Sequence, residues 1–364
     1  MKKSFDKILM ADVLFLCVLG VVMVYSASAY MAMDLYHDEY FFLKREMIFA
    51  LLGLCGMFLA ANFNYVHLRY FVFPFLGLCL FLMILVLIPG IGVKVGGAQR
   101  WLQVGGVKFQ PSEMTKLGLI LYMAHSLKKK EGKIKDFAYG FTPYVVILGV
   151  FFMLMLLQPD LGTAVSLAAV VMLMLFMAGT RLRYLFSLVL VSIPLLYVLI
   201  MGAAYRRRRF MAFLHPWKDA AGAGFQIIQS FLAIGSGGVI GTGLAQGHQE
   251  RLFLPEPHTD FIFAIIGEEL GFIGAVIVVA AFAIFLYRGM LIALRSVDPF
   301  GRYLALGLTG MVSIQALLNL SVVVGLLPTK GLTLPLLSYG GSSLLMTFIG
   351  VGILLNISKW TRER

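Results

Sequence analysis

The chain has 364 residues, of which 60% are hydrophobic and only 13% charged, with a formal net charge of +12. Soluble globular domains carry about 25% charged residues, so this composition excludes an ordinary soluble domain and indicates a polytopic membrane protein. The positive charge does not indicate nucleic-acid binding, because basic residues also accumulate beside membrane spans. The three cysteines lie in apolar runs, which suggests neither a disulfide framework nor a metal cluster.

Apolar stretches long enough to cross a bilayer recur along the chain. The first begins like a signal peptide, but its apolar run reaches about 20 residues, which is the length of an uncleaved span. We predict an all-α polytopic membrane protein with about ten transmembrane helices. No linker divides the helices, so we predict a single domain over residues 1–364. The helix centres fall near residues 21, 54, 80, 119, 149, 169, 192, 272, 313 and 350.

The distribution of Lys and Arg orients these helices, because basic residues of short loops stay in the cytoplasm. With the N-terminus inside, just over half of the 30 basic residues fall in inner segments, and both termini are cytoplasmic. Two long polar connections, residues 90–112 and 204–258, then lie outside. The second is a large outer loop between helices seven and eight.

An arginine run in this outer loop departs from the rule. The segment YRRRRF contains Arg206, Arg207, Arg208 and Arg209. One interpretation is a cytoplasmic anchor at a helix end, which would require one span more or fewer between residues 183 and 258. The other is a cationic surface at the outer face that binds a lipid phosphate or pyrophosphate, because guanidinium groups bind phosphate oxygens bidentately.

The first polar connection, GVKVGGAQRWLQVGGVKFQPSEMTKLGLI, is rich in glycine and predicts a compact loop or small hairpin. Pro111 then opens a helix whose first turn carries Glu113 and Lys116. Their i, i+3 spacing allows an ion pair. A structural pair and a contact with a substrate headgroup both fit this pattern. In the segment QPDLGTA, Asp160 falls at the outer end of the sixth helix.

The segment LPEPHTDFIFAIIGEELGFIG concentrates titratable groups in an apolar context. We expect one helix from residue 261 to 286, starting directly after Asp260. An Asp in this place is ordinarily an N-cap, and a catalytic carboxylate is the alternative. Glu268 and Glu269 fall inside the span, where a carboxylate usually faces a polar interior, and we expect at least one of them to pair with a basic side chain.

Prolines and glycines in GLLPTKGLTLPLLSYGGSSLL, residues 325–345, predict irregular backbone. At membrane depth such backbone is tolerated only where it is buried in protein or lines a cavity. We therefore expect this segment to form one wall of an outward-facing pocket, with Ser338 and Ser342 supplying hydroxyls. The glycine-rich AIGSGGVIGTGLAQG is not a nucleotide loop, because no strand precedes it and it has no Walker lysine.

Four segments together resemble the shape, elongation, division and sporulation (SEDS) family of peptidoglycan polymerases. They are GAQRWL with FQPSE, HPWKDAAGAGFQIIQS, HQERLFLPEPHTDFIFAIIGEELGFIGA and GLLPTKGLTLPLLSYGGSS. The similarity extends over essentially the whole chain, and TKGLTLP and HPWKDAAGAGFQ are closer to the division branch than to the elongation branch. It implies ten spans with cytoplasmic termini in the bacterial cytoplasmic membrane at the septum. The implied activity is polymerisation of lipid II onto an undecaprenyl-pyrophosphate-linked strand.

The resemblance also implies roles for individual residues. The Asp of HTDF, here Asp260, becomes the expected catalytic residue, and this replaces the interpretation of Asp260 as a simple cap. The departing pyrophosphate requires positive charge, for which we assign the arginine run, Lys218, Arg251 and Lys330. The remaining substrate-binding assignments are Glu113, Lys116, Glu256, His258, Ser338 and Ser342. No spacing marks a metal site, although a divalent cation, Mg or Mn, bridging Asp260 or Glu256 to the pyrophosphate would suit the chemistry.

Three alternative functions stay open at this point. Carboxylates in the membrane and broken helices also suit a lipid II transporter, but the charged groups cluster on outer loops rather than at the midplane, which favours a polymerase. An elongation-type polymerase and a division scaffold are the others. The resemblance implies a class B penicillin-binding protein as partner, together with other division proteins of the membrane. Membrane lipid is a further expected partner, and nucleic acid is not.

Overall fold

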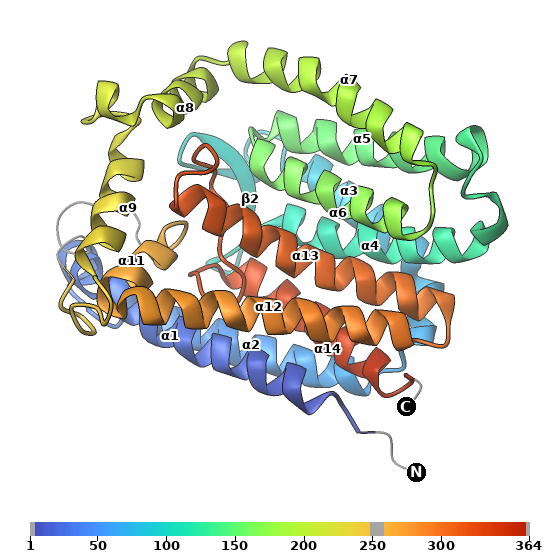
Figure 1. Ribbon diagram of the computed structural model, residues 1–364, viewed down its shortest axis with the longest axis horizontal. Helices are drawn as coiled ribbons and strands as arrows, with labels where there is room; N and C mark the ends of the chain where they lie inside the picture. Colours follow the sequence, from blue (N-terminus) through green and yellow to red (C-terminus); the bar gives the residue numbers. More distant parts are fainter. Residues whose placement is uncertain (1–3, 248–257, 362–364) are drawn as a thin grey trace.

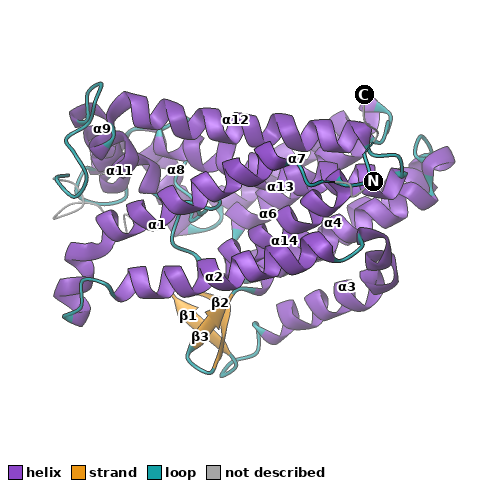
Figure 2. Ribbon diagram, turned by 90° about the horizontal axis from the view of Figure 1, so that it is seen from below, coloured by secondary structure: helices purple, strands orange, loops and turns teal. Residues whose placement is uncertain are grey.

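The computed structural model describes residues 4–247 and 258–361, and it is built mainly of helices that run alongside one another (Figure 1). Two ends of the bundle serve as references. The loop end carries the small β-sheet and residues 324–340, and the terminal end carries both chain termini (Figures 1 and 2).

The helices have the following bounds: α1 (Lys7–Tyr36), α2 (Phe41–Asn62), α3 (Leu68–Leu85), α4 (Pro111–Lys129), α5 (Thr142–Leu157), α6 (Leu161–Met177), α7 (Leu182–Met201), α8 (Ala204–Leu214), α9 (Phe225–Ser236), α11 (Ile262–Glu269), α12 (Gly271–Arg295), α13 (Pro299–Val323) and α14 (Gly341–Ser358). Short helical turns are η1 (Tyr65–His67), η2 (Glu131–Lys133), η3 (Phe137–Phe141) and η4 (Pro216–Asp219). Each predicted centre lies within a helix. Among the described residues, 7 helical segments are long and apolar enough to cross a membrane.

Helix α13 forms much of the interior of the bundle. It packs against α12, α4, α6 and α14, and two thirds of its most apolar window is buried. Helices α2 and α14 form another extensive contact. Helices α3 and α7 instead expose most of their surface, as expected of helices that face lipid. The polar side chains that α13 carries are therefore held inside the protein.

A three-stranded antiparallel sheet follows α3 at the loop end (Figure 2). Its strands are β1 (Gly92–Val95), β2 (Ala98–Val104) and β3 (Val107–Phe109), in the order β1-β2-β3. Glycine pairs at 96–97 and 105–106, all with positive φ, form the tight turns that join antiparallel strands. Of the predicted compact loop or small hairpin, the hairpin is confirmed, and the sheet is a small addition to a fold that is otherwise helical.

The prediction of a single helix over residues 261–286 is wrong, because the segment forms two helices, α11 and α12, with a break between them. Gly271 has a φ of 66° at the break, a conformation that favours glycine. The glycine-rich segment 237–243 packs its backbone there. The Thr242 N–H donates to the Glu268 carbonyl at 3.0 Å, and the Phe272 N–H donates to the Gly238 carbonyl at 2.9 Å. These glycines therefore permit close backbone contact, a role that the sequence alone did not show.

Candidate active site

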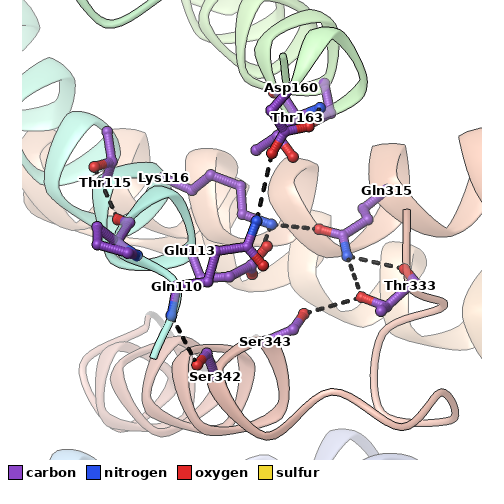
Figure 3. Close-up of polar contacts among 12 residues, drawn as sticks. Gln110, Glu113, Thr115, Lys116, Asp160, Thr163, Gln315, Thr333, Ser342 and Ser343 are labelled. Carbon is purple, nitrogen blue, oxygen red and sulfur yellow. Dashed lines mark hydrogen bonds and ion pairs between the residues drawn. The ribbon is translucent and has the colours of Figure 1, made fainter. Parts of the chain in front are cut away.

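A buried ion pair opens α4 at the loop end (Figure 3). The Lys116 Nζ lies 2.8 Å from the Glu113 Oε2, and the two side chains are only 4% and 8% exposed. Pro111 occupies the first turn of the helix, where its missing N–H costs nothing. The predicted i, i+3 ion pair is confirmed.

The side chain of Gln315, on α13, links this ion pair to the loop before α14. Lys116 donates to the Gln315 Oε1 at 2.6 Å. The amide of Gln315 in turn donates to the Thr333 carbonyl at 2.9 Å and contacts its hydroxyl at 3.3 Å (Figure 3). The hydroxyl of Thr333 lies 3.3 Å from that of Ser343. The charged pair is therefore part of a continuous polar network rather than an isolated contact.

One helical turn further along α13, Asn319 makes the corresponding link to Asp260. Its Nδ2 donates to the Leu332 carbonyl at 2.6 Å and to the Asp260 carbonyl at 2.8 Å. Gln315 and Asn319 share a face of the helix because they are four residues apart. Together they fix residues 332–333 and connect Lys116 with the Asp260 backbone.

The Asp260 side chain lies against the same loop. A Cβ atom placed on Gly331 would lie 3.3 Å from the Asp260 Oδ2, so the carboxylate borders the Gly331 backbone. Asp260 is half-buried, and it precedes Phe261, which is the N-cap residue of α11. Asp260 therefore does not occupy the N-cap position that an ordinary helix cap would require.

Lys330 directly precedes Gly331, the glycine that borders the Asp260 carboxylate, and is half-buried. A Cβ atom on Gly162, in the first turn of α6, would lie 3.4 Å from the Lys330 Cβ. Lys330 therefore lies against the first turn of α6, and the residue after it borders Asp260. Burial lowers the pKa of Lys330 below its usual range. A lysine of lowered pKa gives up its proton more readily to a nearby base or leaving group.

Asp160 lies at the start of α6, as predicted, and it is buried beside the network. It accepts a hydrogen bond from the Thr163 N–H at 3.2 Å and another from the Gln110 amide at 3.4 Å (Figure 3). Arg100, from strand β2, lies 3.8 Å from its carboxylate. Asp160 therefore caps α6 and ties this helix to the sheet.

Ser338 and Ser342 are both buried and bonded to backbone groups. The Ser338 hydroxyl accepts from the Leu334 N–H at 2.8 Å. The Ser342 hydroxyl accepts from the Gln110 N–H at 3.1 Å. Ser338 therefore shapes the loop before α14, and Ser342 joins the first turn of α14 to Gln110, so both hydroxyls have a supporting role in the site.

His258 is buried between two aromatic rings. Its ring centroid lies 4.4 Å from that of Phe42 and 5.4 Å from that of Tyr339, and its carbonyl accepts from the Tyr339 N–H at 2.9 Å. Burial lowers the pKa of His258 to about 4. The imidazole is therefore neutral at physiological pH and packs the segment that leads into Asp260.

The neutral state of His258 predicts a pH effect on stability. Unfolded histidine binds a proton near pH 6.5, whereas folded His258 binds one only near pH 4. Stability is therefore fully present above about pH 6.5 and falls as the pH drops toward 4, because the unfolded state then binds more protons. Thermal unfolding between pH 7 and 4 should show this slope in the wild type and a shallower one in His258→Asn. Equal slopes would contradict it.

The arginine run lies on α8, at the loop end beside α9 (Figure 1). Arg207, Arg208 and Arg209 are exposed, as is Lys218 on η4. The run pairs locally, since Arg208 lies 3.1 Å from Asp219 and Arg206 donates to the Leu199 carbonyl at 2.9 Å. Within residues 4–247 and 258–361, no hydrogen bond or ion pair joins it to the Asp260 region. It forms a separate cationic surface at the same end.

Two of the predicted substrate-binding residues, Arg251 and Glu256, lie outside the described residues. Glu269 accepts from the Ser26 hydroxyl at 2.5 Å and from the Ala245 N–H at 3.2 Å. The described part of the chain contains no group of three His, Cys, Asp or Glu side chains placed to hold a metal ion.

The sequence interpretation missed Gln315 and Asn319, whose signal was two amides four residues apart in an apolar span.

This fold and site define a multi-pass membrane protein with a buried acid–base network at one end of its helix bundle. The sequence matches the FtsW/RodA/SpoVE family of cell cycle proteins over residues 7–363, and the chain belongs to that family. It is 51% identical over 356 residues to the probable peptidoglycan glycosyltransferase FtsW of Geobacter metallireducens, covering 98% of this chain and 95% of that protein.

Solved structures agree with this assignment. One, described as "Structural coordination of polymerization and crosslinking by a peptidoglycan synthase complex", has a TM-score of 0.81 and 32% identity, covering 97% of each chain. The rod shape determining protein RodA of Thermus thermophilus has a TM-score of 0.73 and 30% identity, covering 99% of this chain and 98% of that chain.

Proposed function

We propose that this protein is a peptidoglycan glycosyltransferase that polymerises lipid II into glycan strands during septal cell-wall synthesis. The observation that carries the proposal is the network that joins the Glu113–Lys116 pair through Gln315 and Asn319 to the Asp260 segment. It lies at one end of the bundle, where a sugar headgroup is accessible while its lipid stays in the bilayer. The identity of 51% to a probable FtsW supports the division role.

The proposed topology has ten spans, with α11 and α12 together forming the eighth. The terminal end then faces the cytoplasm and the loop end faces outward. Support comes from the lysines and arginines of the connections at residues 128–135 and 181–183, because basic residues of short loops stay inside. The site is therefore at the outer face of the bacterial cytoplasmic membrane, and both chain termini are cytoplasmic.

In the proposed reaction, Asp260 acts as the general base. Its carboxylate takes the proton of the acceptor 4-hydroxyl as that oxygen attacks the anomeric carbon of the donor strand. The bond from this carbon to the pyrophosphate breaks on the opposite face, so the configuration inverts and a β-1,4 bond forms. A positioned base contributes about 10²- to 10⁴-fold to such a step.

The leaving undecaprenyl pyrophosphate carries the developing negative charge and requires cations. Lys330 is adjacent in sequence to the glycine that Asp260 touches, so it is our first assignment. The exposed Arg207, Arg209 and Lys218 supply the wider cationic surface, to which Arg251 belongs by sequence. A divalent cation, Mg or Mn, held between Asp260 or Glu256 and the pyrophosphate would neutralise the same charge.

Asn319 is a positioning residue in this scheme, because it holds the Asp260 carbonyl and the Leu332 carbonyl of the facing loop. Asn319→Leu removes both hydrogen bonds while keeping the branching at Cγ and the number of side-chain heavy atoms. We expect polymerisation to fall by about 10²-fold, the usual cost of misplacing a catalytic group by roughly 1 Å. Asn62→Leu removes an exposed amide at the terminal end and is the control, which should keep full activity. Unchanged activity of Asn319→Leu would contradict the positioning role.

The proposed partner is a class B penicillin-binding protein that crosslinks the new strands, within a larger set of division proteins. The support is the similarity to a chain from a peptidoglycan synthase complex, at a TM-score of 0.81. This chain supplies the membrane-embedded part of such an assembly.

A reconstitution experiment separates this function from lipid II transport. Vesicles that carry the protein and fluorescent lipid II are assayed in parallel for glycan strands and for transfer of the label between leaflets. A polymerase produces strands at a rate unrelated to transfer. Transfer without strands, in the presence of the partner, would overturn the proposal in favour of a transporter.

A further inference from the structure

A cavity lies at the terminal end, away from the site described above. It occupies about 520 Å³ between α3, α4 and the connection 130–141. Its lining includes Lys129, Lys130 and Lys133, together with the aromatic residues Phe73 and Tyr139. No carboxylate is among the described residues that line it. The proposed reaction makes no use of this cavity.

The three lysines of this cavity lack acidic partners in the described part of the chain. The neighbouring Lys128 differs, because it pairs with Asp298 at 3.0 Å. Two of the ammonium groups lie near aromatic rings instead, with Lys130 at 5.3 Å from the Tyr144 ring and Lys133 at 5.7 Å from the Tyr139 ring. Such contacts leave ammonium protons available, so the lysines that line the cavity can donate to an anion.

The rim of the cavity carries aromatic side chains on the exposed surface of the helix bundle. Phe73 is 62% exposed, Tyr139 is 67% exposed, and Tyr70 on the same helix is 78% exposed. Helix α3 buries only 17% of its most apolar window, which is typical of a helix that faces lipid. Exposed aromatic residues gather at the membrane–water interface. The cavity therefore lies at headgroup level, with lysines on its polar side and an apolar helix surface next to it.

We propose that this cavity binds the phosphate group of an anionic phospholipid of the cytoplasmic leaflet. The phosphate oxygens accept hydrogen bonds from Lys129, Lys130 and Lys133, and the acyl chains lie along the exposed face of α3 beside Phe73. Basic pockets between spans on the cytoplasmic side are suited to such headgroups. The inference rests on the orientation given under Proposed function, but it does not depend on the polymerase activity.

Native mass spectrometry of the purified protein with phosphatidylglycerol or phosphatidylcholine tests the proposal. The wild type should retain phosphatidylglycerol selectively. Lys129→Gln/Lys130→Gln/Lys133→Gln should bind it at least about tenfold more weakly, because it lacks the three ammonium groups that donate charge-assisted hydrogen bonds to the phosphate. The matched control, Lys7→Gln/Lys135→Gln/Arg181→Gln, removes the same charge from exposed positions and should bind like the wild type.

A second variant fills the cavity without changing its charge. A Cβ atom on Gly132, which also lines the cavity, meets no atom within 4 Å, so Gly132→Trp places a ring there at little cost to folding. It should lose phosphatidylglycerol to the same extent as the lysine triple variant. Equal loss in the control triple, or normal binding by Gly132→Trp, would overturn the proposal. Displacement of the lipid by inorganic phosphate at matching concentration would assign the cavity to free phosphate instead.

Discussion

Replacing Lys116 by methionine is expected to destabilise the protein by about 3–5 kcal/mol, because it leaves the buried Glu113 carboxylate without its cation. Both side chains are less than a tenth exposed, so water cannot compensate for the lost partner. Thermal unfolding of the purified protein in detergent measures the effect. The exposed pair of Lys44 and Asp38 provides a matched control, since water compensates for its loss and Lys44→Met should unfold at nearly the wild-type temperature.

The double variant Glu113→Gln/Lys116→Met distinguishes a structural pair from a functional one. It removes both charges, so most of the stability should return. We expect polymerisation to stay low, because the bond from Lys116 to Gln315 that shapes the loop 332–333 is also lost. Full activity of the double variant would show that the pair only stabilises the fold. A Lys116→Met protein that unfolds at the same temperature as the wild type would contradict the expected cost of leaving the Glu113 carboxylate unpaired.

Asp260→Asn should lower the rate of lipid II polymerisation by about 10²- to 10⁴-fold, since an amide cannot take the acceptor proton. The substitution is nearly isosteric and keeps the backbone carbonyl that Asn319 holds. Folding should therefore be retained, and thermal unfolding checks this. Polymerisation is measured from the glycan strands formed from labelled lipid II.

Asp34→Asn is the control for this experiment. Asp34 lies at the loop end of α1 and is exposed, so its replacement removes one negative charge from the same face without touching the site. Its activity should equal that of the wild type. Full activity of a folded Asp260→Asn protein would move the base to another carboxylate, with Glu113, Asp160 and Glu256 as the next candidates.

The sequence predicted the helices well, because apolar stretches of spanning length are a local property. It also predicted the sheet region, through its glycine-rich turns, and the Glu113–Lys116 pair, through helical spacing. The break at Gly271 was not predictable in this way. It depends on backbone contacts with residues 237–243, and the apolar pattern continues across the break without interruption.

The site itself depends on contacts between distant parts of the chain. Lys116 and Gln315 are separated by 199 positions, and no periodicity within either segment indicates that they meet. The resemblance pointed to Asp260, but it did not show that Asn319 holds the Asp260 backbone. It also did not separate Ser338 and Ser342, which support the loop, from residues free to contact a substrate. These distinctions require the packed structure.

Polymerisation of labelled lipid II by the purified protein, alone and with its cognate class B penicillin-binding protein, tests the central claim most directly. We predict β-1,4-linked glycan strands with the wild type and their loss in both Asp260→Asn and Asp260→Ala, while both variants stay folded. A folded wild type that makes no strands even with its partner would contradict the account.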